Sequence, residues 1–486
     1  MTITVRDTLL IGGEWRKPSA GDRIQVVSPS TENVLGQVPD AGADDVDMAV
    51  GAAREAFDHG PWRRMPLQER VTLLERALDA LEPQLPSIAE LVTAEMGLPS
   101  AIAAKKIPGA PAAGRLFLRT ALEIPESEVL QTPYGPTAVL REPVGVVAAI
   151  APWNSPFNMA VTKIVPALVT GCSVVYKPAP ETPLDVFPLA EALTAAGLPP
   201  GVLNLVTGGT STGQALVAHP GVDKVSFTGS TAAGRHIART CADRFTRLQL
   251  ELGGKSAAIV LADADPATVV RGIAMGSFGN TGQTCSAYSR ILVPAHQYDQ
   301  WLEAVTAAAQ SFTVGDPRDP ATTMGPLVSA AQRDRVLGYI SVGKAEGARL
   351  VCGGGAPEGL ERGYYVQPTV FACDDNSLRI CQEEIFGPVA VVLPYTDLEQ
   401  ALRIAEDSPY GLHGAVFTQD PQAAAQVTRS VRTGTFSVNS FVHNTHAPFG
   451  GMKASGIGRE LGRAGIEAFH ELRTVNLTPE TAPLFG

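Results

Sequence analysis

The feature that most constrains the fold is a regular alternation of apolar and amphipathic segments that begins near residue 143. Short apolar runs typical of buried strands occupy Val144–Ile150, Ser173–Tyr176, Val202–Val206 and Lys224–Thr228. Helical patterns follow them, the first over Thr162–Thr170. A second alternating block runs from Ala257 to about Thr435. Repeated β-α-β units bury parallel strands between helices on both faces of a sheet. The sequence therefore predicts an α/β fold with two blocks of parallel sheet.

The segments outside these blocks have other patterns. The pair Gly12–Gly13 separates two short strand-like runs and predicts a tight hairpin turn. Between Pro66 and Leu81 apolar residues recur with a period near 3.6, which indicates an amphipathic helix with the proline in its first turn. Ser127–Glu142 has no helical stripe and contains two prolines and a glycine. We interpret it as an exposed hairpin, with a surface loop as the alternative.

Length and charge exclude several classes of protein. A chain of 486 residues is too long for one small core and indicates two or three domains. Lys and Arg number 38 against 49 Asp and Glu, for a net charge of −11, which argues against a nucleic-acid partner. Apolar stretches such as Val144–Pro152 are broken well short of the roughly 20 residues that span a membrane. We therefore expect no nucleic-acid partner and no membrane association.

The six cysteines carry information about the compartment. None forms a Cys-x-x-Cys pair, and their spacing suits neither a zinc site nor a disulfide framework. His443 and His446 resemble a metal-binding pair but lack further ligands nearby, so no metal site is expected. The N-terminus also lacks the charged start and apolar core of a signal peptide. These features predict reduced thiols and a cytoplasmic location.

Cys285 and Glu251 are the residues that best indicate the chemistry. Each lies in a glycine-rich run, Gly282-Gln-Thr-Cys285 and Glu251-Leu-Gly-Gly254. Covalent catalysis at a carbonyl needs a thiolate that attacks and a base that activates the water releasing the product. Glycines allow the backbone to approach a small reacting carbon closely. The alternative is that Cys285 is a small buried apolar residue, as free cysteines usually are.

A further glycine-rich loop, Gly229–Gly234, follows a strand and opens a helix. This context suits phosphate binding by the free N–H groups of a helix N-terminus. Arg235 and His236 stand where a P-loop would carry Lys and Ser or Thr, which argues against an ATPase or kinase. The loop alone would equally fit a tight strand-to-helix connection.

Taken together, the motifs resemble those of the NAD(P)-dependent aldehyde dehydrogenase superfamily over essentially the whole chain. The matching motifs are Pro152-Trp-Asn154, Lys177-Pro178, Phe227-Thr-Gly-Ser230, Glu251-Leu-Gly-Gly254, Gly282-Gln-Thr-Cys285, Glu383-Glu-Ile-Phe-Gly-Pro388 and Pro448-Phe-Gly-Gly451. Each motif is modest evidence by itself, whereas seven in the right order are highly specific.

The resemblance implies an aldehyde dehydrogenase-like α/β fold with two Rossmann-like parallel-sheet domains and a β oligomerisation hairpin. Residues 1–121 and 142–253 would form the cofactor-binding domain, and residues 254–453 the catalytic domain. Residues 122–141 and 454–486 would supply the oligomerisation segment and the C-terminal tail. Members of the superfamily are typically homodimers or homotetramers, so we expect one of these assemblies.

The resemblance also implies the catalytic roles. Cys285 resembles the nucleophile that attacks the aldehyde to give a thiohemiacetal, which passes to a thioester. Asn154 resembles the side chain that stabilises the oxyanion together with the backbone N–H of Cys285. Glu251 resembles the base that activates the hydrolytic water. Lys163 and Glu460 resemble accessory proton-relay residues, with an ordinary ion pair as the alternative. The expected activity is oxidation of an aldehyde to the carboxylic acid.

The implied cofactor is NAD, with NADP possible. The expected cofactor-binding residues are Trp153, Lys177, Gly229, Ser230, Gly234, Leu252, Glu384 and Phe386. Lys177 would bind the adenosine ribose, Ser230 the pyrophosphate and Glu384 the nicotinamide ribose. Many NAD-preferring members carry Glu three residues after the lysine, whereas this chain has Pro180 there and Glu181 one place later. Proline offers neither an acceptor nor a repelling charge, so NADP stays open.

The substrate is expected to be a small-molecule aldehyde of medium or bulky size, aromatic or aliphatic. Positions that line the tunnel of relatives are small or polar here, namely Asn158, Thr162 and Gly279, with Thr284 and Ser286 beside the nucleophile. The alternative is that the loop Asn439–His446 refills this space.

Two rival functions keep the same fold. The first is a semialdehyde dehydrogenase that transfers the acyl group to coenzyme A, which Glu251 argues against because hydrolysis needs an activated water. The second is a non-catalytic protein, which the presence of Cys285, Glu251 and Asn154 argues against.

Overall fold

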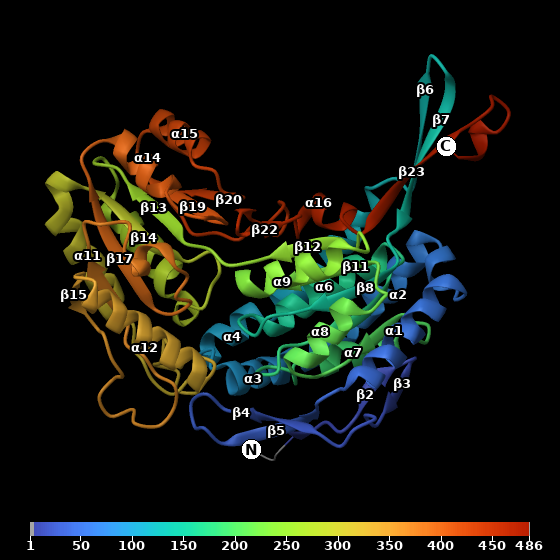
Figure 1. Cartoon of the computed structure of the whole chain (residues 1–486), viewed down its shortest axis with the longest axis horizontal. Helices are drawn as coiled ribbons and strands as arrows, with labels where there is room; N and C mark the ends of the chain where they lie inside the picture. The colour runs from blue at the N-terminus through green and yellow to red at the C-terminus, as the bar shows by residue number, and fades with distance from the viewer. Residues whose placement is uncertain (1–3, 486) are drawn as a thin grey trace.

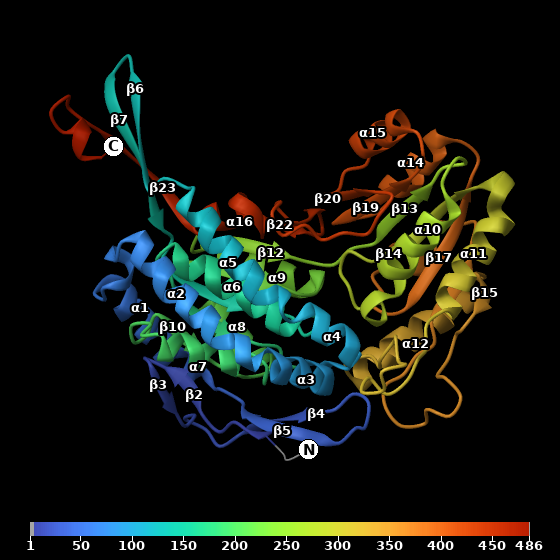
Figure 2. The same ribbon diagram turned by 180° about the vertical axis from the view of Figure 1, so that it is seen from behind.

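The computed structural model describes residues 4–485. Figures 1 and 2 show two α/β bodies side by side and a hairpin that projects away from them. The first body contains an eight-stranded sheet in the order β22-β12-β11-β8-β9-β10-β2-β3. Its strands are β2 (Leu9–Ile11), β3 (Glu14–Arg16), β8 (Val146–Ile150), β9 (Ser173–Lys177), β10 (Leu203–Leu205), β11 (Lys224–Thr228), β12 (Arg247–Glu251) and β22 (Gly456–Ile457).

The five central strands of this sheet are parallel, and helices cover both of its faces. Strand β8 is buried throughout because alternate residues enter two different cores. Val147 and Ala149 pack into one core, and Val146, Ala148 and Ile150 into the other. This double burial explains why the strand is uniformly apolar instead of alternating.

Nine α-helices between residues 43 and 242 pack in this body. They are α1 (Ala43–Asp58), α2 (Leu67–Leu81), α3 (Leu85–Met96), α4 (Ser100–Lys106), α5 (Gly109–Leu122), α6 (Pro156–Val169), α7 (Phe187–Ala195), α8 (Thr210–Ala218) and α9 (Thr231–Ala242). Helix α2 matches the predicted helix but begins one residue later, with Pro66 as its N-cap. The hairpin predicted at Gly12–Gly13 joins β2 to β3, and both glycines have positive φ.

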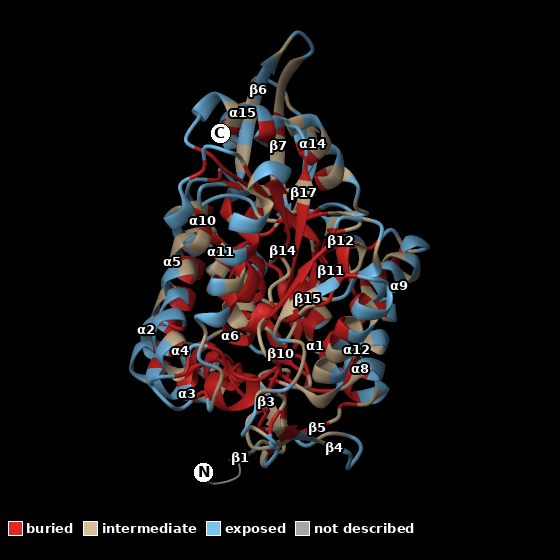
Figure 3. Ribbon diagram, turned by 90° about the vertical axis from the view of Figure 1, so that its left-hand side faces the viewer, coloured by how far each residue is buried: buried red, intermediate tan, exposed pale blue. Residues whose placement is uncertain are grey.

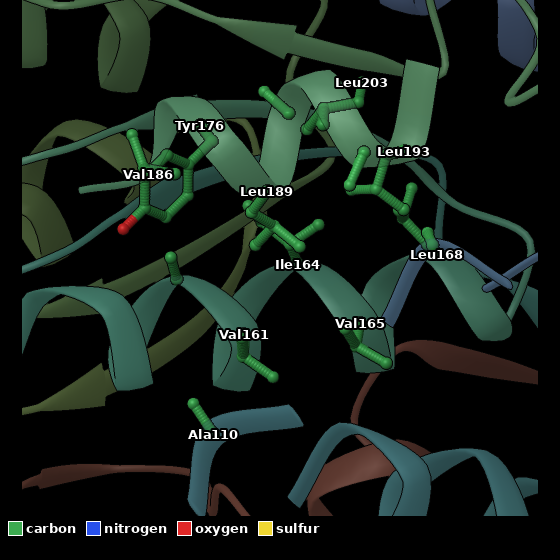
Figure 4. Close-up of a cluster of buried hydrophobic side chains, with 14 of the residues drawn as sticks. Ala110, Val161, Ile164, Val165, Leu168, Tyr176, Val186, Leu189, Leu193 and Leu203 are labelled. Atoms are coloured by element: carbon green, nitrogen blue, oxygen red, sulfur yellow. The ribbon is translucent and has the colours of Figure 1, made fainter. Parts of the chain in front are cut away.

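Helix α6 is central to the site because it starts immediately after the Pro152-Trp-Asn154 motif. Figure 4 shows Val161 and Val165 pointing toward α5, and Ile164 and Leu168 pointing toward α7. Its first turns are only partly buried at Asn158, Met159 and Thr162. This polar face concealed the first turns in the sequence, which indicated a helix only from Thr162 to Thr170. The observed helix begins at Pro156, a favourable first-turn residue.

The second body contains a seven-stranded sheet in the order β15-β16-β17-β14-β13-β19-β20. Only the edge pair β15–β16 is antiparallel. The strands are β13 (Ser256–Val260), β14 (Tyr288–Pro294), β15 (Arg349–Cys352), β16 (Thr369–Ala372), β17 (Val389–Tyr395), β19 (His413–Phe417) and β20 (Thr435–Val438). The helices are α10 (Pro266–Ile273), α11 (Tyr298–Gln310), α12 (Ala330–Ala345), α13 (Arg379–Gln382), α14 (Leu398–Glu406) and α15 (Pro421–Ser430). Figure 3 shows buried strands within a shell of more exposed helices.

Three small sheets complete the molecule. The predicted hairpin over residues 127–142 is present as β6 (Ser127–Thr132) and β7 (Gly135–Pro143), and β23 (His470–Asn476) pairs with β7. Near the N-terminus, β1 (Thr4–Val5), β4 (Arg23–Val27) and β5 (Val34–Pro39) form a sheet. Strands β18 (Tyr410–Gly411) and β21 (Met452–Lys453) form a two-stranded antiparallel sheet. Helix α16 (Gly462–Glu467) precedes β23. No helix within residues 4–485 combines the length and apolar character needed to cross a membrane.

Candidate active site

The loop that carries Cys285 is held in an unusual backbone conformation. Asn280 and Thr281, which lie between α10 and β14, both have φ of 57°. Non-glycine residues adopt this left-handed conformation only when their surroundings stabilise it. The Asn280 side chain donates to the backbone carbonyls of Asn154 at 2.9 Å and Gln283 at 3.2 Å, and Thr281 donates to the carbonyl of Gly325 at 3.1 Å. These bonds fix the approach of the chain to Cys285.

Glycine allows the Glu251 motif to lie directly against the nucleophile. A Cβ atom on Gly254 would lie 2.4 Å from the carbonyl oxygen of Cys285. A Cβ on Gly253 would lie 2.3 Å from a carboxylate oxygen of Glu384. The N–H of Gly254 donates to Glu384 at 3.1 Å. Any side chain at these two positions would therefore push the Glu251 motif away from the motifs that contain Cys285 and Glu384.

Asn154 is oriented by the nucleophile loop. Its side-chain Nδ2 donates to the carbonyl of Gln283 at 2.9 Å, while its own carbonyl accepts from Asn280. An amide NH₂ group has two N–H donors, and this is the one Nδ2 bond found within residues 4–485. The second N–H therefore stays available for an oxygen atom next to Cys285.

Glu251 ends β12 and lies beside a buried ion pair. Lys163 Nζ lies 2.7 Å from Glu460 Oε1 and 3.1 Å from Ser226 Oγ. Both Glu251 carboxylate oxygens are buried and lack a hydrogen-bond partner among the described residues. Burial and the neighbouring Glu460 carboxylate raise the pKa of Glu251 to about 9, although Lys163 acts in the opposite direction. A carboxylate with so high a pKa is a much stronger base than an ordinary glutamate.

The thiol of Cys285 is also held in its neutral form. Burial raises the pKa of Cys285 to about 12, and the carboxylates of Glu384 and Glu251 add to this effect. A thiolate is the nucleophilic form of cysteine, so attack near neutral pH requires a base that accepts the proton. Of the two carboxylates in the same cavity, Glu251 is the more basic, with a pKa of about 9 against about 7 for Glu384.

One cavity of about 220 Å³ brings most of the predicted site together. Its walls contain the predicted residues Trp153, Asn154, Gly229, Ser230, Glu251, Leu252, Cys285, Glu384 and Phe386. The rings of Trp153 and Phe386 meet edge to face with centroids 5.3 Å apart. Phe386 has φ of 61°, a strained value for an aromatic residue. Burial raises the pKa of Glu384 to about 7, while the Gly254 N–H and Arg335 stabilise its ionised form.

The cavity has the groups that a dinucleotide needs. Ser230 is exposed at the N-terminus of α9, where free backbone N–H groups favour phosphate. Glu384 offers an acceptor for ribose hydroxyls, and the rings of Trp153 and Phe386 flank the space near Cys285. These residues therefore fit a nicotinamide dinucleotide, which the motifs implied.

Four predicted residues lie outside the walls of this cavity. Lys163 and Glu460 are behind Glu251, as described above. Lys177 is buried at the end of β9 and donates to the carbonyl of Pro178 at 3.1 Å. Gly234 lies in the first turn of α9, where a Cβ atom would come within 2.5 Å of Leu252. Its visible role is to let Leu252 pack closely.

Arg335 and Gln332 of α12 also line the cavity, and no motif in the sequence indicates them. Arg335 Nη2 donates to the carbonyl of Glu384 at 2.5 Å, and Gln332 Nε2 donates to the carbonyl of Phe386 at 2.7 Å. Both bonds hold the segment that carries the two predicted residues. They connect positions far apart in the chain, which no local pattern could reveal.

A model of the aldehyde dehydrogenase family matches residues 15–475. The chain belongs to this family. It is an NAD(P)-dependent aldehyde dehydrogenase, which oxidises aldehydes to carboxylic acids. The family, fold class and enzymatic activity predicted from the sequence are confirmed. Within residues 4–485, no three His, Cys, Asp or Glu side chains are grouped so as to hold a metal ion.

Relatives of this dehydrogenase match it along nearly its whole length. It is 45% identical to geranial dehydrogenase of Castellaniella defragrans over 96% of this chain and 98% of the relative. It is 43% identical to 3-succinoylsemialdehyde-pyridine dehydrogenase of a Pseudomonas species over 96% of this chain and 97% of the relative. The Mycobacterium tuberculosis aldehyde dehydrogenase complexed with NAD⁺ superposes with a TM-score of 0.96 at 47% identity, covering 98% and 99% of the two chains. A mutant of aldehyde dehydrogenase C from Pseudomonas syringae, complexed with NAD⁺ and octanal, superposes with a TM-score of 0.92 at 38% identity, covering 97% and 96%.

Proposed function

We propose that Cys285 is the nucleophile of this aldehyde dehydrogenase and that Asn154 and Glu251 complete its catalytic machinery. The observation that supports this most is that the side chains of all three line one cavity. The backbone of the Cys285 loop also accepts the Asn154 amide hydrogen bond. Attack by the sulfur on the aldehyde carbon converts the carbonyl oxygen to an oxyanion, while Glu251 accepts the thiol proton.

The free Nδ2–H of Asn154 and the backbone N–H of Cys285 would donate to this oxyanion. Both donors are fixed before reaction by the bonds of the nucleophile loop. Preorganised donors of this kind need no reorganisation when negative charge develops. Nicotinamide, when bound, supplies the acceptor for the hydride that leaves the former aldehyde carbon. Sulfur then holds the acyl group as a thioester.

Glu251 would deprotonate the water that hydrolyses the thioester. The Lys163–Glu460 ion pair is close enough to Glu251 for both of its charges to act on the Glu251 pKa. This pair would accept the proton that Glu251 takes from the water. Hydrolysis favours release of a free carboxylic acid over transfer to coenzyme A. We also propose residues 1–121 and 142–253 as the cofactor-binding domain and residues 254–453 as the catalytic domain. A reduced catalytic thiol fits a cytoplasmic location.

The proposed cofactor is NAD. The relatives from Mycobacterium tuberculosis and Bacillus cereus were crystallised with NAD⁺. Two carboxylates, Glu181 and Asp40, lie close enough to Lys177 to act on its pKa, which they raise. Burial lowers the pKa of Lys177 to about 8. Glu181 therefore remains close to the ribose-binding lysine although Pro180 occupies the position of the usual glutamate. Two carboxylates here would repel a 2′-phosphate.

This cofactor assignment predicts at least a tenfold higher kcat/KM with NAD than with NADP. Glu181→Gln should narrow that ratio, because it removes one of the two repelling charges. Absorbance of the reduced nicotinamide, recorded with aliphatic, aromatic and terpenoid aldehydes, measures both the activity and the preference. Glu69→Gln, an exposed carboxylate on α2, is the matched control. Equal efficiency with both cofactors would contradict the assignment.

We further propose that the enzyme is a homodimer or homotetramer assembled through the hairpin sheet. Strands β6 and β7 project from the body together with β23 (Figures 1 and 2). This sheet exposes apolar side chains to solvent, with exposed fractions of 100% for Tyr134, 69% for Leu472 and 42% for Leu130. Apolar groups gathered on a projecting sheet are typical of an interface.

Assembly through this sheet predicts a particle mass of two or four chains by light scattering. Leu472→Glu should shift the mass toward the monomer at micromolar concentration, because it places a charge within the contact. Met48→Glu changes a leucine-sized exposed residue on α1 and serves as the control. A monomeric wild-type enzyme would contradict the proposal.

A further inference from the structure

Next to the nucleophile lies a polar pair that the mechanism does not use. Ser286 Oγ and His443 Nε2 are 3.1 Å apart and share a hydrogen bond. Ser286 directly follows Cys285, and His443 lies on the loop after β20. This loop therefore reaches the residue next to the nucleophile. Ser286 and His443 do not line the cofactor cavity.

The Ser286–His443 pair always has one hydrogen-bond donor to spare. Desolvation by the surrounding protein and the nearby Lys106 lower the pKa of His443, although part of the residue is exposed to solvent, so its ring is neutral near pH 7 and carries one N–H. The serine hydroxyl carries a second proton. Their mutual bond uses one of these protons in either tautomer, which leaves either the Ser286 O–H or the His443 Nδ1–H free. Whichever ring nitrogen carries the proton, one donor of the pair is free to bond an acceptor atom of a ligand.

Lys106 adds a positive charge to the same region. It ends α4 and acts electrostatically on His443. Partial desolvation by the surrounding protein lowers its pKa, and no carboxylate contributes to that pKa. Within residues 4–485, Lys106 has neither an ion-pair nor a hydrogen-bond partner. The adjacent Lys105 is also exposed, and it is not among the charges that act on His443.

The groups packed around His443 are mainly aromatic. Its ring meets Phe441 edge to face at 5.1 Å and lies 5.7 Å from Phe449. Behind it, His413 bonds Ser437 at 3.0 Å, and burial lowers the pKa of His413 to about 3, so it carries no charge. Among the described residues, Lys106 is the one charge that acts on His443 and no carboxylate offsets it there, whereas Glu384 and Glu251 act on the neighbouring Cys285.

We propose that this region selects aldehydes whose chain carries an acceptor oxygen, with a terminal carboxylate as the preferred form. The inference rests on the proposed function, because it places the substrate chain on the Ser286 side of Cys285. The carboxylate of such an oxo acid would meet the Lys106 ammonium and the spare donor of the Ser286–His443 pair. Ser286, His443 and Lys106 act here as specificity residues and take no part in bond making.

An unsubstituted aldehyde would bury the same donors without a partner. A site with unmatched polar groups discriminates strongly against such a ligand, and charged hydrogen bonds give the largest effects. Asn158 and Thr162, which are partly exposed on α6, add polar groups to the helix that follows Asn154.

The test compares each ω-oxo acid of a graded series with the unsubstituted alkanal of the same length. The quantity measured is the ratio of their kcat/KM values with NAD. We expect the wild-type ratio to exceed about 10, and Lys106→Met and His443→Phe each to lower it about tenfold. Lys105→Met, on the same turn of α4, should leave the ratio unchanged.

The dependence of KM on salt concentration distinguishes the loss of a charge contact with the substrate from damage to the structure of a variant. In the wild type, added salt should raise KM for the oxo acid but not for the alkanal, and Lys106→Met should remove this difference. A wild-type ratio near or below 1, or a ratio that neither variant changes, would overturn the proposal. Absence of activity with every aldehyde would instead refute the proposed function, so the two failures are distinguishable.

Discussion

Replacing Cys285 with alanine is expected to reduce aldehyde oxidation by roughly 10⁵- to 10⁶-fold, the size of effect found when a covalent nucleophile is removed. Alanine cannot form the bond to the aldehyde carbon, and no other cysteine lines the cavity. The Cys285 side chain is only partly buried, so its truncation should leave the fold intact. Steady-state turnover with NAD and a good aldehyde measures the loss, and thermal unfolding checks the fold.

Cys352→Ala is the matched control, because Cys352 is also partly buried but lies in β15, away from the cavity. It should retain wild-type turnover. Mass spectrometry of protein quenched during turnover should find an acyl adduct on the peptide with Cys285 in the wild type and none in Cys285→Ala. Substantial oxidation by the alanine variant would overturn the assignment of the nucleophile.

The sequence predicted the centre of the site well because its motifs lie next to strand ends. Glu251 ends β12, and the Asn154 and Ser230 motifs follow β8 and β11. The carboxyl ends of parallel strands meet at one edge of a sheet, so residues placed there converge without detailed knowledge of the fold. Six of the predicted residues line the cavity for this reason, namely Trp153, Asn154, Gly229, Ser230, Glu251 and Leu252, whereas Cys285, Glu384 and Phe386 reach it from loops that precede β14 and β17.

Other parts of the site could not be predicted from local patterns. Arg335 and Gln332 reach the cavity only because α12 packs beside the segment after α13. The electrostatic effect of Lys106 on His443 relates α4 to a loop more distant still in the chain. The early turns of α6 were missed because their polar face lines the site instead of the core. Each of these cases depends on tertiary packing, which overrides local propensity.

Replacing Glu251 with glutamine is expected to slow steady-state turnover by about 10²- to 10⁴-fold, the usual contribution of a general base. Glutamine keeps the shape of the side chain but cannot accept a proton. Glu384, the other carboxylate of the cavity, acts on Cys285 and remains able to accept its proton, so the step that forms the thioester should still outrun hydrolysis. We expect a rapid release of close to one equivalent of reduced nicotinamide per active site, followed by slow turnover, in a stopped-flow absorbance experiment.

The pH dependence of hydrolysis tests the same residue independently. Because the pKa of Glu251 is raised to about 9, its carboxyl is mostly protonated at neutral pH, and the protonated form cannot accept a proton from water. The fraction in the basic form rises about tenfold per pH unit below that value. In the wild type, hydrolysis should therefore accelerate with pH and level off near 9. Glu251→Gln should remove this ionisation and flatten the profile.

Glu69→Gln, which neutralises an exposed carboxylate on α2, should preserve both the rate and the pH profile of the wild type. A Glu251→Gln enzyme that turned over at the wild-type rate would show that another group activates the water. A slow variant without the initial release of reduced nicotinamide would place the defect before the thioester, which would make Glu251 the acceptor of the Cys285 proton alone. The ratio of burst amplitude to active sites thus decides which of the two proton transfers depends on this carboxylate.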